Sequence, residues 1–371
     1  MRRSTLVTVA GLMFVGGSIA QDKSNAKTEA ARFIKQHDSN ADGKLSRDEF
    51  PRRARPLFDR IDRNEDGFVE LDEDIAFRLG RTRQESQPPQ RRARPSVPSG
   101  FVATRDVEYA EADGVRLLLD VYAPEEPSKP RPLIVWVHGG GWRNGSKDQC
   151  PALRFLELGY IVASVEYRLS NVAIYPAQIQ DCKAAIRWLR ANAKSYSIDP
   201  DRVGVWGSSA GGHLAALLGT SGEDDFLEGK HGNTQQSSRV QAVCDFFGPT
   251  DFSQMDAHAL SAAPFKHDAP DSPEALVIGG PVQENPDKVA RANPITYVSS
   301  DDPPFLIVHG DQDPLVPLHQ SQLLFDALKR VKCDVRLHIV AGGAHGFGRA
   351  PKVDKLVEEF FADKLRLESQ E

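Results

Sequence analysis

The most informative segment of this 371-residue chain is Val203-Gly204-Val205-Trp206-Gly207-Ser208-Ser209-Ala210-Gly211-Gly212. An apolar strand pattern ends there in a glycine-rich turn, and an alanine- and leucine-rich helix pattern follows from residue 213 to 218. Gly207, Ser209 and Gly211 form a G-x-S-x-G motif, in which a side chain larger than hydrogen on either glycine would collide with neighbouring backbone. This spacing exposes the Ser209 hydroxyl at a helix N-terminus, so Ser209 is the candidate nucleophile.

A second glycine-rich turn lies upstream. Residues 132–137 form an apolar strand pattern that ends in His138-Gly139-Gly140-Gly141-Trp142. Three consecutive glycines leave backbone N–H groups unobstructed, and such groups can bind the negative oxygen that develops when a serine attacks a carbonyl. The backbone N–H of Ala210, at the start of the helix after the serine, is the other expected donor. The sequence therefore predicts an oxyanion hole that combines N–H groups of the triple-glycine turn with the N–H of Ala210.

Two further strand patterns end in chemically reactive residues. Residues 304–308 lead into Asp311 and Asp313, and residues 335–340 lead into His345. Parallel strands bring their carboxyl ends to one edge of a sheet, so these side chains are expected near Ser209. A serine needs an imidazole base, and the base needs a carboxylate that fixes its tautomer.

These motifs resemble the α/β-hydrolase carboxylesterases, a group that includes bacterial feruloyl and acetyl-xylan esterases and hormone-sensitive-lipase-like enzymes. The resemblance covers about residues 101–366 and rests on HGGGW, GSSAGG, HGDQDPLVP and GAHGF. It implies an α/β fold with a mostly parallel eight-stranded sheet. It also implies Ser209 as nucleophile, Asp313 as acid and His345 as base. By the same resemblance, Gly140, Gly141 and Ala210 supply the oxyanion N–H groups. Asp311 is the rival acid, and His309 is a weaker rival base that fits better as a support for the loop.

The N-terminal region carries two copies of a different pattern. From Asp38 to Glu49, oxygen-bearing residues occupy positions 1, 3, 5, 9 and 12 of a twelve-residue loop, with glycine at position 6. The pattern recurs from Asp62 to Glu73. The candidate calcium ligands, with Lys44 and Phe68 contributing backbone carbonyls, are Asp38, Asn40, Asp42, Lys44, Ser46, Glu49, Asp62, Asn64, Asp66, Phe68, Glu70 and Glu73.

Both loops resemble the EF-hand family, which implies two structural calcium sites in a small all-α pair over residues 24–79. The loops are unusually close, and Pro51 and Pro56 interrupt the segment between them, which leaves room for one short helix. We expect calcium to stabilise this unit rather than to open a large groove. A surface partner for the unit is a further expectation.

Composition places the remaining segments. Residues 1–20 read as an export signal with a cleavage site after Ala20, because two arginines precede an apolar stretch shorter than the roughly 20 residues that span a membrane. Residues 80–100, rich in proline and arginine, form a linker before a catalytic domain at 101–371. We expect a secreted or periplasmic protein with no membrane span after cleavage. Its four cysteines allow three disulfide pairings, with free thiols equally acceptable.

The expected function is hydrolysis of carboxylic esters through an acyl-enzyme, on a small ester or a polysaccharide ester such as an acetyl or feruloyl ester. No metal or nucleotide cofactor is required for that chemistry. The formal net charge of -6 disfavours nucleic acid as a partner. An amidase or peptidase with the same triad, and a noncatalytic calcium-dependent surface-binding protein, remain alternatives.

Overall fold

The computed structural model describes residues 16–51, 58–62, 66–77, 94, 96–126, 129–222, 224–347 and 350–365, without the side chains of residues 16–26, 59 and 60. The chain divides into two compact units, Met1–Ala93 and Arg94–Glu371. The division falls within the linker expected at 80–100, of which residues 80–93 and 95 lie outside the described part. The expected signal segment also lies outside it up to residue 15.

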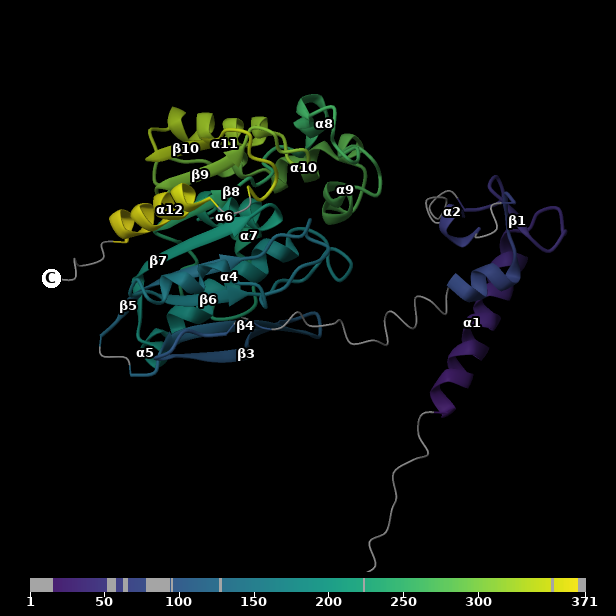
Figure 1. Ribbon diagram of the computed structural model, residues 1–371, viewed down its shortest axis with the longest axis horizontal. Helices are drawn as coiled ribbons and strands as arrows, with labels where there is room; N and C mark the ends of the chain where they lie inside the picture. Colours follow the sequence, from purple (N-terminus) through teal and green to yellow (C-terminus); the bar gives the residue numbers. More distant parts are fainter. Residues whose placement is uncertain are drawn as a thin grey trace, which may run out of the picture. The chain divides into compact units, whose positions relative to one another are not determined.

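The second unit is built on an eight-stranded sheet with the order β10-β9-β8-β7-β5-β6-β4-β3 (Figure 1). The strands from β6 through β5, β7, β8 and β9 to β10 pair in parallel, while β3 with β4 and β4 with β6 pair antiparallel. The expected mostly parallel eight-stranded sheet is therefore present. The strand bounds are β3 Phe101–Ala112, β4 Val115–Pro124, β5 Arg131–Val137, β6 Ile161–Val165, β7 Ile198–Ser208, β8 Ala242–Phe246, β9 Phe305–Gly310 and β10 Val335–Val340.

Helices cover both faces of this sheet, which is why the central strands are apolar on both sides. On one face Val203 and Val205 of β7 pack into a cluster with residues of α4, α6 and α11. On the other face Trp206 joins a second cluster with α12 and the short helix η2. The helix bounds are η2 Pro151–Phe155, α4 Ala177–Ala191, α5 Ala193–Tyr196, α6 Ala210–Thr220, α7 Asp225–Glu228, η3 Phe252–Gln254, α8 Met255–His258, α9 Pro273–Ile278, η4 Val282–Glu284, α10 Pro286–Ala292, η5 Pro294–Tyr297, α11 Leu318–Arg330 and α12 Pro351–Lys364.

The first unit comprises α1 (Gly16–His37), β1 (Leu45–Ser46), α2 (Phe58–Ile61), β2 (Phe68–Val69) and a helical segment at 71–77. Its apolar core includes Ile34, Leu45 and Phe58. The expectation of an all-α unit is incomplete, because β1 and β2 pair antiparallel, with Leu45 opposite Val69. Each loop has a short extended segment that lies outside the helices. The two segments satisfy their backbone N–H and carbonyl groups by pairing with each other.

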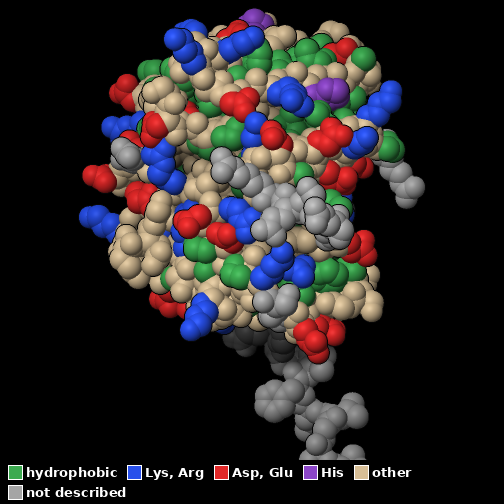
Figure 2. All heavy atoms as spheres, turned by 90° about the vertical axis from the view of Figure 1, so that its left-hand side faces the viewer, with side chains coloured by type: hydrophobic (Ala, Val, Ile, Leu, Met, Phe, Trp, Pro, Cys, Tyr) green, Lys and Arg blue, Asp and Glu red, His purple; other side chains and the backbone are tan. Residues whose placement is uncertain are grey.

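Charge is mixed in sign on one face of the molecule. Figure 2 shows Lys and Arg side chains interspersed with Asp and Glu over the face in view. Within the described ranges, no helix combines the length and the apolar character needed to cross a membrane. All four cysteines are free thiols, three of them buried.

Candidate active site

Ser209 stands on a strained turn between β7 and α6. Its backbone has φ 55° and ψ -124°, a conformation that costs about 1–3 kcal/mol in an ordinary residue. A Cβ atom on Gly207 would lie 2.0 Å from the carbonyl oxygen of Gly211, and one on Gly211 would lie 2.1 Å from that of Val137. Both glycines of the motif are therefore required for steric reasons. The Ser209 N–H donates to the carbonyl of Phe246 at 2.8 Å, which fixes the turn to the end of β8.

Asp313 and His345 lie together at the ends of β9 and β10. The Nδ1 atom of His345 is 2.7 Å from Oδ2 of Asp313. Oδ1 of Asp313 accepts hydrogen bonds from the N–H groups of Leu315 and Val316 at 2.8 and 3.0 Å. Burial alone would raise the pKa of Asp313, but hydrogen bonds from His309, His345 and Val316 lower that pKa below its ordinary value. The carboxylate is thus held charged beside the imidazole.

The two rival residues have other partners. Oδ1 of Asp311 accepts a hydrogen bond from the N–H of Gly342 at 2.7 Å. His309 is fully buried, with Nδ1 2.7 Å from the Ser321 hydroxyl and Nε2 2.8 Å from the carbonyl oxygen of Val316. Its Nε2 is also 3.4 Å from Asp313. His309 therefore supports the loop that carries the acid.

Phe247 connects the histidine to the serine turn. Its ring centroid lies 4.4 Å from that of His345, and Phe247 directly follows the residue whose carbonyl binds the Ser209 N–H. Among the described residues, no hydrogen bond joins the Ser209 hydroxyl to His345. Hydrogen bonds between nucleophile and base are often loose in unliganded enzymes and tighten when substrate is bound.

The triple-glycine loop lies against the nucleophile. A Cβ atom on Gly139 would lie 3.2 Å from Cβ of Ser209. Gly140 and Gly141 adopt positive φ angles of 117° and 60°. Ala210 is the first residue of α6, so its N–H is among those that lack an acceptor within the helix. The three expected oxyanion donors are thus on two segments that meet at Ser209.

His138 has a structural environment. Its ring stacks on Tyr167 with centroids 4.3 Å apart, and its Nδ1 lies 2.8 Å from the carbonyl oxygen of Gly139. Burial lowers the pKa of His138 to about 4. A neutral imidazole in this position packs under the glycine loop and shapes the turn.

Sequence reasoning missed two residues of the site, Phe247 and Asp245. Asp245 is buried, its Oδ1 accepts a hydrogen bond from the Gly248 N–H at 2.9 Å, and its Oδ2 has no hydrogen-bond partner within the described part of the chain. Burial raises the pKa of Asp245 to about 7, although the hydrogen bond from Gly248 opposes this shift. A carboxylic acid at the end of an apolar strand pattern was the available signal.

In the first unit, the loops expected to bind calcium have matching turns. Asp38 accepts a hydrogen bond from the Gly43 N–H at 2.8 Å, and Asp62 accepts one from the Gly67 N–H at 3.0 Å. Glu49 instead accepts hydrogen bonds from Ser39, Asn40 and Ser46. Searched over the described residues, the structure has no group of three His, Cys, Asp or Glu side chains arranged to hold a metal ion. Asn64 lies outside the described residues.

Comparison with known proteins identifies the second unit. The family described as BD-FAE matches residues 119–328. This chain belongs to the BD-FAE family. The BD-FAE match begins within β4, includes the glycine loop, Ser209 and Asp313, and ends within α11.

Individual relatives of this BD-FAE chain are esterases by name. Esterase LipQ of Mycobacterium tuberculosis is 34% identical over 269 residues, which are 71% of this chain and 62% of LipQ. The chain thus spans less than two thirds of that relative's length. A solved structure described as a truncated form of carbohydrate esterase from gut microbiota has 34% identity and a TM-score of 0.66, and covers 74% of this chain and 99% of its own. Thermogutta terrifontis esterase 2, phosphorylated by paraoxon, has 27% identity and a TM-score of 0.56 over 73% of this chain and 96% of its own. The expected α/β-hydrolase esterase domain is confirmed.

Proposed function

We propose that this chain is a serine carboxylesterase that forms its acyl-enzyme on Ser209. The observation that carries the proposal is the 2.7 Å contact between Asp313 and Nδ1 of His345, made by a histidine whose ring packs on Phe247 beside the serine turn. The esterase names of the relatives support the same reaction class.

Asp313 determines which ring nitrogen of His345 carries the proton. A carboxylate that accepts from Nδ1–H leaves Nε2 of His345 unprotonated, and this nitrogen is the atom that can take the Ser209 proton. The serine oxygen then attacks the ester carbonyl, and N–H groups of Gly140, Gly141 and Ala210 bind the resulting oxyanion. His345 returns its proton to the leaving alcohol. Water repeats the sequence and releases the acid.

For the substrate, we favour an ester carried by a polysaccharide. The match to the carbohydrate esterase extends over nearly the whole length of that protein. This similarity supports a sugar as the alcohol part of the ester. An export signal over residues 1–20 would place the enzyme outside the cytoplasm, where such polymers are found. Acetyl and feruloyl esters are the two acyl groups to test first.

Calcium is the second part of the proposal. The donor set fits the ion, since Asp38, Asn40, Asp42, Ser46 and Glu49 offer oxygens, and the backbone of both loops already turns at its glycine. The second loop would use Asp62, Asn64, Asp66, Glu70 and Glu73, and Lys44 and Phe68 would each give a carbonyl. Bound calcium would supply charge neutralisation and a cross-link that stabilises the loops. The hydrolytic steps use only residues of the second unit.

The proposal is tested by labelling and by turnover on the mature protein. A fluorophosphonate should modify Ser209, and the protein should hydrolyse nitrophenyl acetate, acetylated xylan or a feruloylated oligosaccharide. Absence of both an adduct and ester turnover from a folded protein would reject it. Turnover of amides in preference to matched esters would favour an amidase instead.

A further inference from the structure

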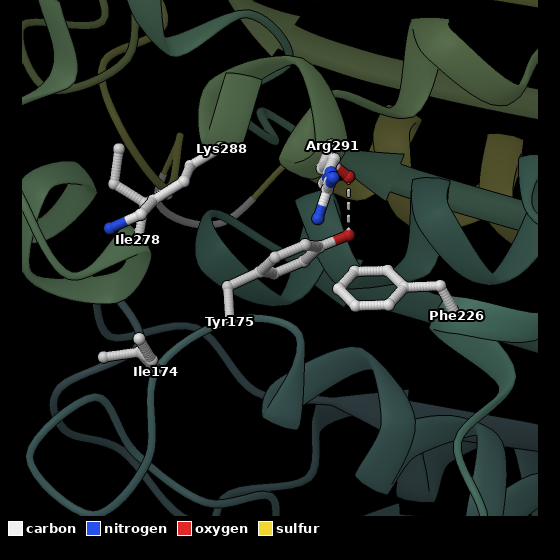
Figure 3. A pocket seen from close by; sticks show the side chains of 6 residues that line it. All are labelled: Ile174, Tyr175, Phe226, Ile278, Lys288 and Arg291. Atoms are coloured by element: carbon white, nitrogen blue, oxygen red, sulfur yellow. Dashed lines mark hydrogen bonds between the residues drawn. The ribbon is translucent and has the colours of Figure 1, made fainter. Parts of the chain in front are cut away.

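The second unit has a cavity of about 170 Å³ (Figure 3). Its lining combines two aliphatic side chains, two aromatic rings and two cations, and in Figure 3 the Tyr175 ring lies at the centre of the set. The lining residues are Ile174, Tyr175, Phe226, Ile278, Lys288 and Arg291. We call this the 174–291 pocket.

The two cations of the 174–291 pocket have no carboxylate partner in the part of the chain that the structure describes. Nζ of Lys288 is 3.2 Å from the carbonyl oxygen of Gly279, and the guanidinium of Arg291 lies over the Phe226 ring at 5.3 Å. Over the described ranges, neither side chain makes an ion pair with an Asp or Glu. The carboxylate that acts on the neighbouring Tyr175 belongs to Asp224, whose side chain caps α7 by accepting from the Leu227 N–H. Two positive charges are therefore available to an anionic ligand, although the chain as a whole has a net charge of -6.

The aromatic rings add an apolar surface to the pocket. The Tyr175 hydroxyl donates to the backbone carbonyl of Arg291 at 2.8 Å, so the polar end of this side chain is already used. Phe226 and Ile174 remain 46% and 49% exposed. Aromatic faces carry partial negative charge and attract the C–H bonds on one side of a sugar ring.

The pocket is physically joined to the glycine loop. Helix α9 begins at Pro273, whose Cβ would lie 3.2 Å from a Cβ atom on Gly141, and it ends at Ile278 in the pocket wall. At about 1.5 Å rise per residue, α9 spans roughly 9 Å. The Tyr175 N–H also donates to the Val277 carbonyl at 2.8 Å. The pocket thus lies within reach of a short oligosaccharide that presents its ester to Ser209.

We propose that the 174–291 pocket binds an anionic sugar unit, a uronate or a sulfated sugar, in the alcohol part of the ester. The inference rests on the proposed function, which supplies the sugar. A guanidinium binds carboxylate or sulfate oxygens in pairs, while Lys288 adds a point charge and the rings take the apolar face. An acetyl or feruloyl group carries no negative charge in the ester, and a fatty acyl chain would cover both cations with hydrocarbon.

The kinetic test compares three variants with the unmodified protein. Arg291→Gln and Lys288→Gln remove one charge each, and Arg291→Gln retains the backbone carbonyl that binds Tyr175. The matched control is Lys352→Gln, at an exposed lysine of α12. Substrates are acetylated xylo-oligosaccharides with and without a glucuronic acid branch, an acetylated sulfated oligosaccharide, and nitrophenyl acetate.

We expect each pocket variant to lower kcat/KM about three- to tenfold on an anionic sugar ester, mainly through KM, since each cation contributes a partly exposed ion pair. Turnover of the neutral oligosaccharide and of nitrophenyl acetate should not change, and the control should match the unmodified protein throughout. Loss on the uronate substrate alone or on the sulfated substrate alone identifies the ligand. Equal loss on neutral and anionic substrates, or no loss on either anionic substrate, overturns the proposal.

A binding measurement separates this inference from the proposed function. Calorimetry on Ser209→Ala with a glucuronic-acid-branched xylo-oligosaccharide, and with a sulfated oligosaccharide, both free of esters, should show binding to one of them that weakens with salt and with Arg291→Gln. Binding without any esterase activity in the unmodified protein would reject the function and retain the pocket. Activity on neutral sugar esters without binding of either anion would retain the function and reject the pocket.

Discussion

The Nδ1 atom of His345 lies 2.7 Å from Oδ2 of Asp313, and this contact selects Asp313 over Asp311 as the proposed acid. Replacing Asp313 by Asn should lower kcat on a nitrophenyl ester on the order of 10³–10⁴-fold, because the amide no longer holds the imidazole in the required tautomer. Asp311→Asn is the matched control, since Asp311 accepts a bond from Gly342 and should change kcat less than tenfold. A larger loss from Asp311→Asn than from Asp313→Asn would reverse the assignment.

Ser209→Ala should remove turnover, with a loss on the order of 10⁵–10⁶ in kcat, because the bond to the acyl group can no longer form. Ser208→Ala, one residue earlier, is the control and should retain most activity. Mass spectrometry after fluorophosphonate treatment should find the adduct on the unmodified protein and on the control only. Labelling of Ser209→Ala at normal stoichiometry would show that another residue is the nucleophile.

Asp245 should make stability depend on pH. Its pKa is raised from the ordinary 3.8 to about 7 by burial, so between these values the folded protein keeps a proton that the unfolded chain releases. The contribution to stability is complete below about pH 4 and is lost as pH rises through 7. Asp245→Asn cannot lose that proton, so its free energy of unfolding relative to the unmodified protein should rise between pH 4 and pH 8, by on the order of 2–4 kcal/mol.

Urea unfolding at several pH values measures this difference. The control is Asp271→Asn, at an exposed aspartate, which should shift stability by the same small amount at each pH. A pH-independent difference for Asp245→Asn would mean that the carboxyl group is ionised throughout.

Calcium should stabilise the first unit without setting the rate of hydrolysis. Chelation should increase hydrogen exchange and proteolysis over residues 38–49 and 66–73, while kcat on nitrophenyl acetate stays within about twofold, since the proposed hydrolytic residues all belong to the second unit. Glu73→Gln removes a charged ligand and should weaken calcium binding about tenfold or more, whereas Asp72→Asn, at the exposed neighbour, should not. Turnover that follows calcium occupancy while the second unit remains folded would contradict the prediction.

The motifs were informative where parallel strands end. Since the strand patterns before Ser209, Asp313 and His345 belong to one parallel sheet, the sequence alone could place these residues at one edge. The steric need for Gly207 and Gly211 was likewise readable, because the clash is with backbone.

Features built from several segments could not be read in this way. Phe247 is an ordinary apolar residue until β8 and β10 bring its ring against His345. The pairing of Leu45 with Val69 depends on two loops meeting in space. The twelve-residue loop pattern describes each loop separately, so it predicts the helices but not this pairing. The 174–291 pocket combines side chains from three separate parts of the sequence, none of which forms a motif.

Residues at the end of β8 contact both the serine turn and His345. The Phe246 carbonyl accepts the hydrogen bond from the Ser209 N–H, and the Phe247 ring packs against the His345 imidazole. A displacement of the end of β8 would therefore reach the nucleophile through a hydrogen bond and the base through a ring contact. Asp313 lies on the loop after β9, and hydrogen bonds from Gly342 to Asp311 and from Gln312 to Gly343 tie that loop to the one that carries His345.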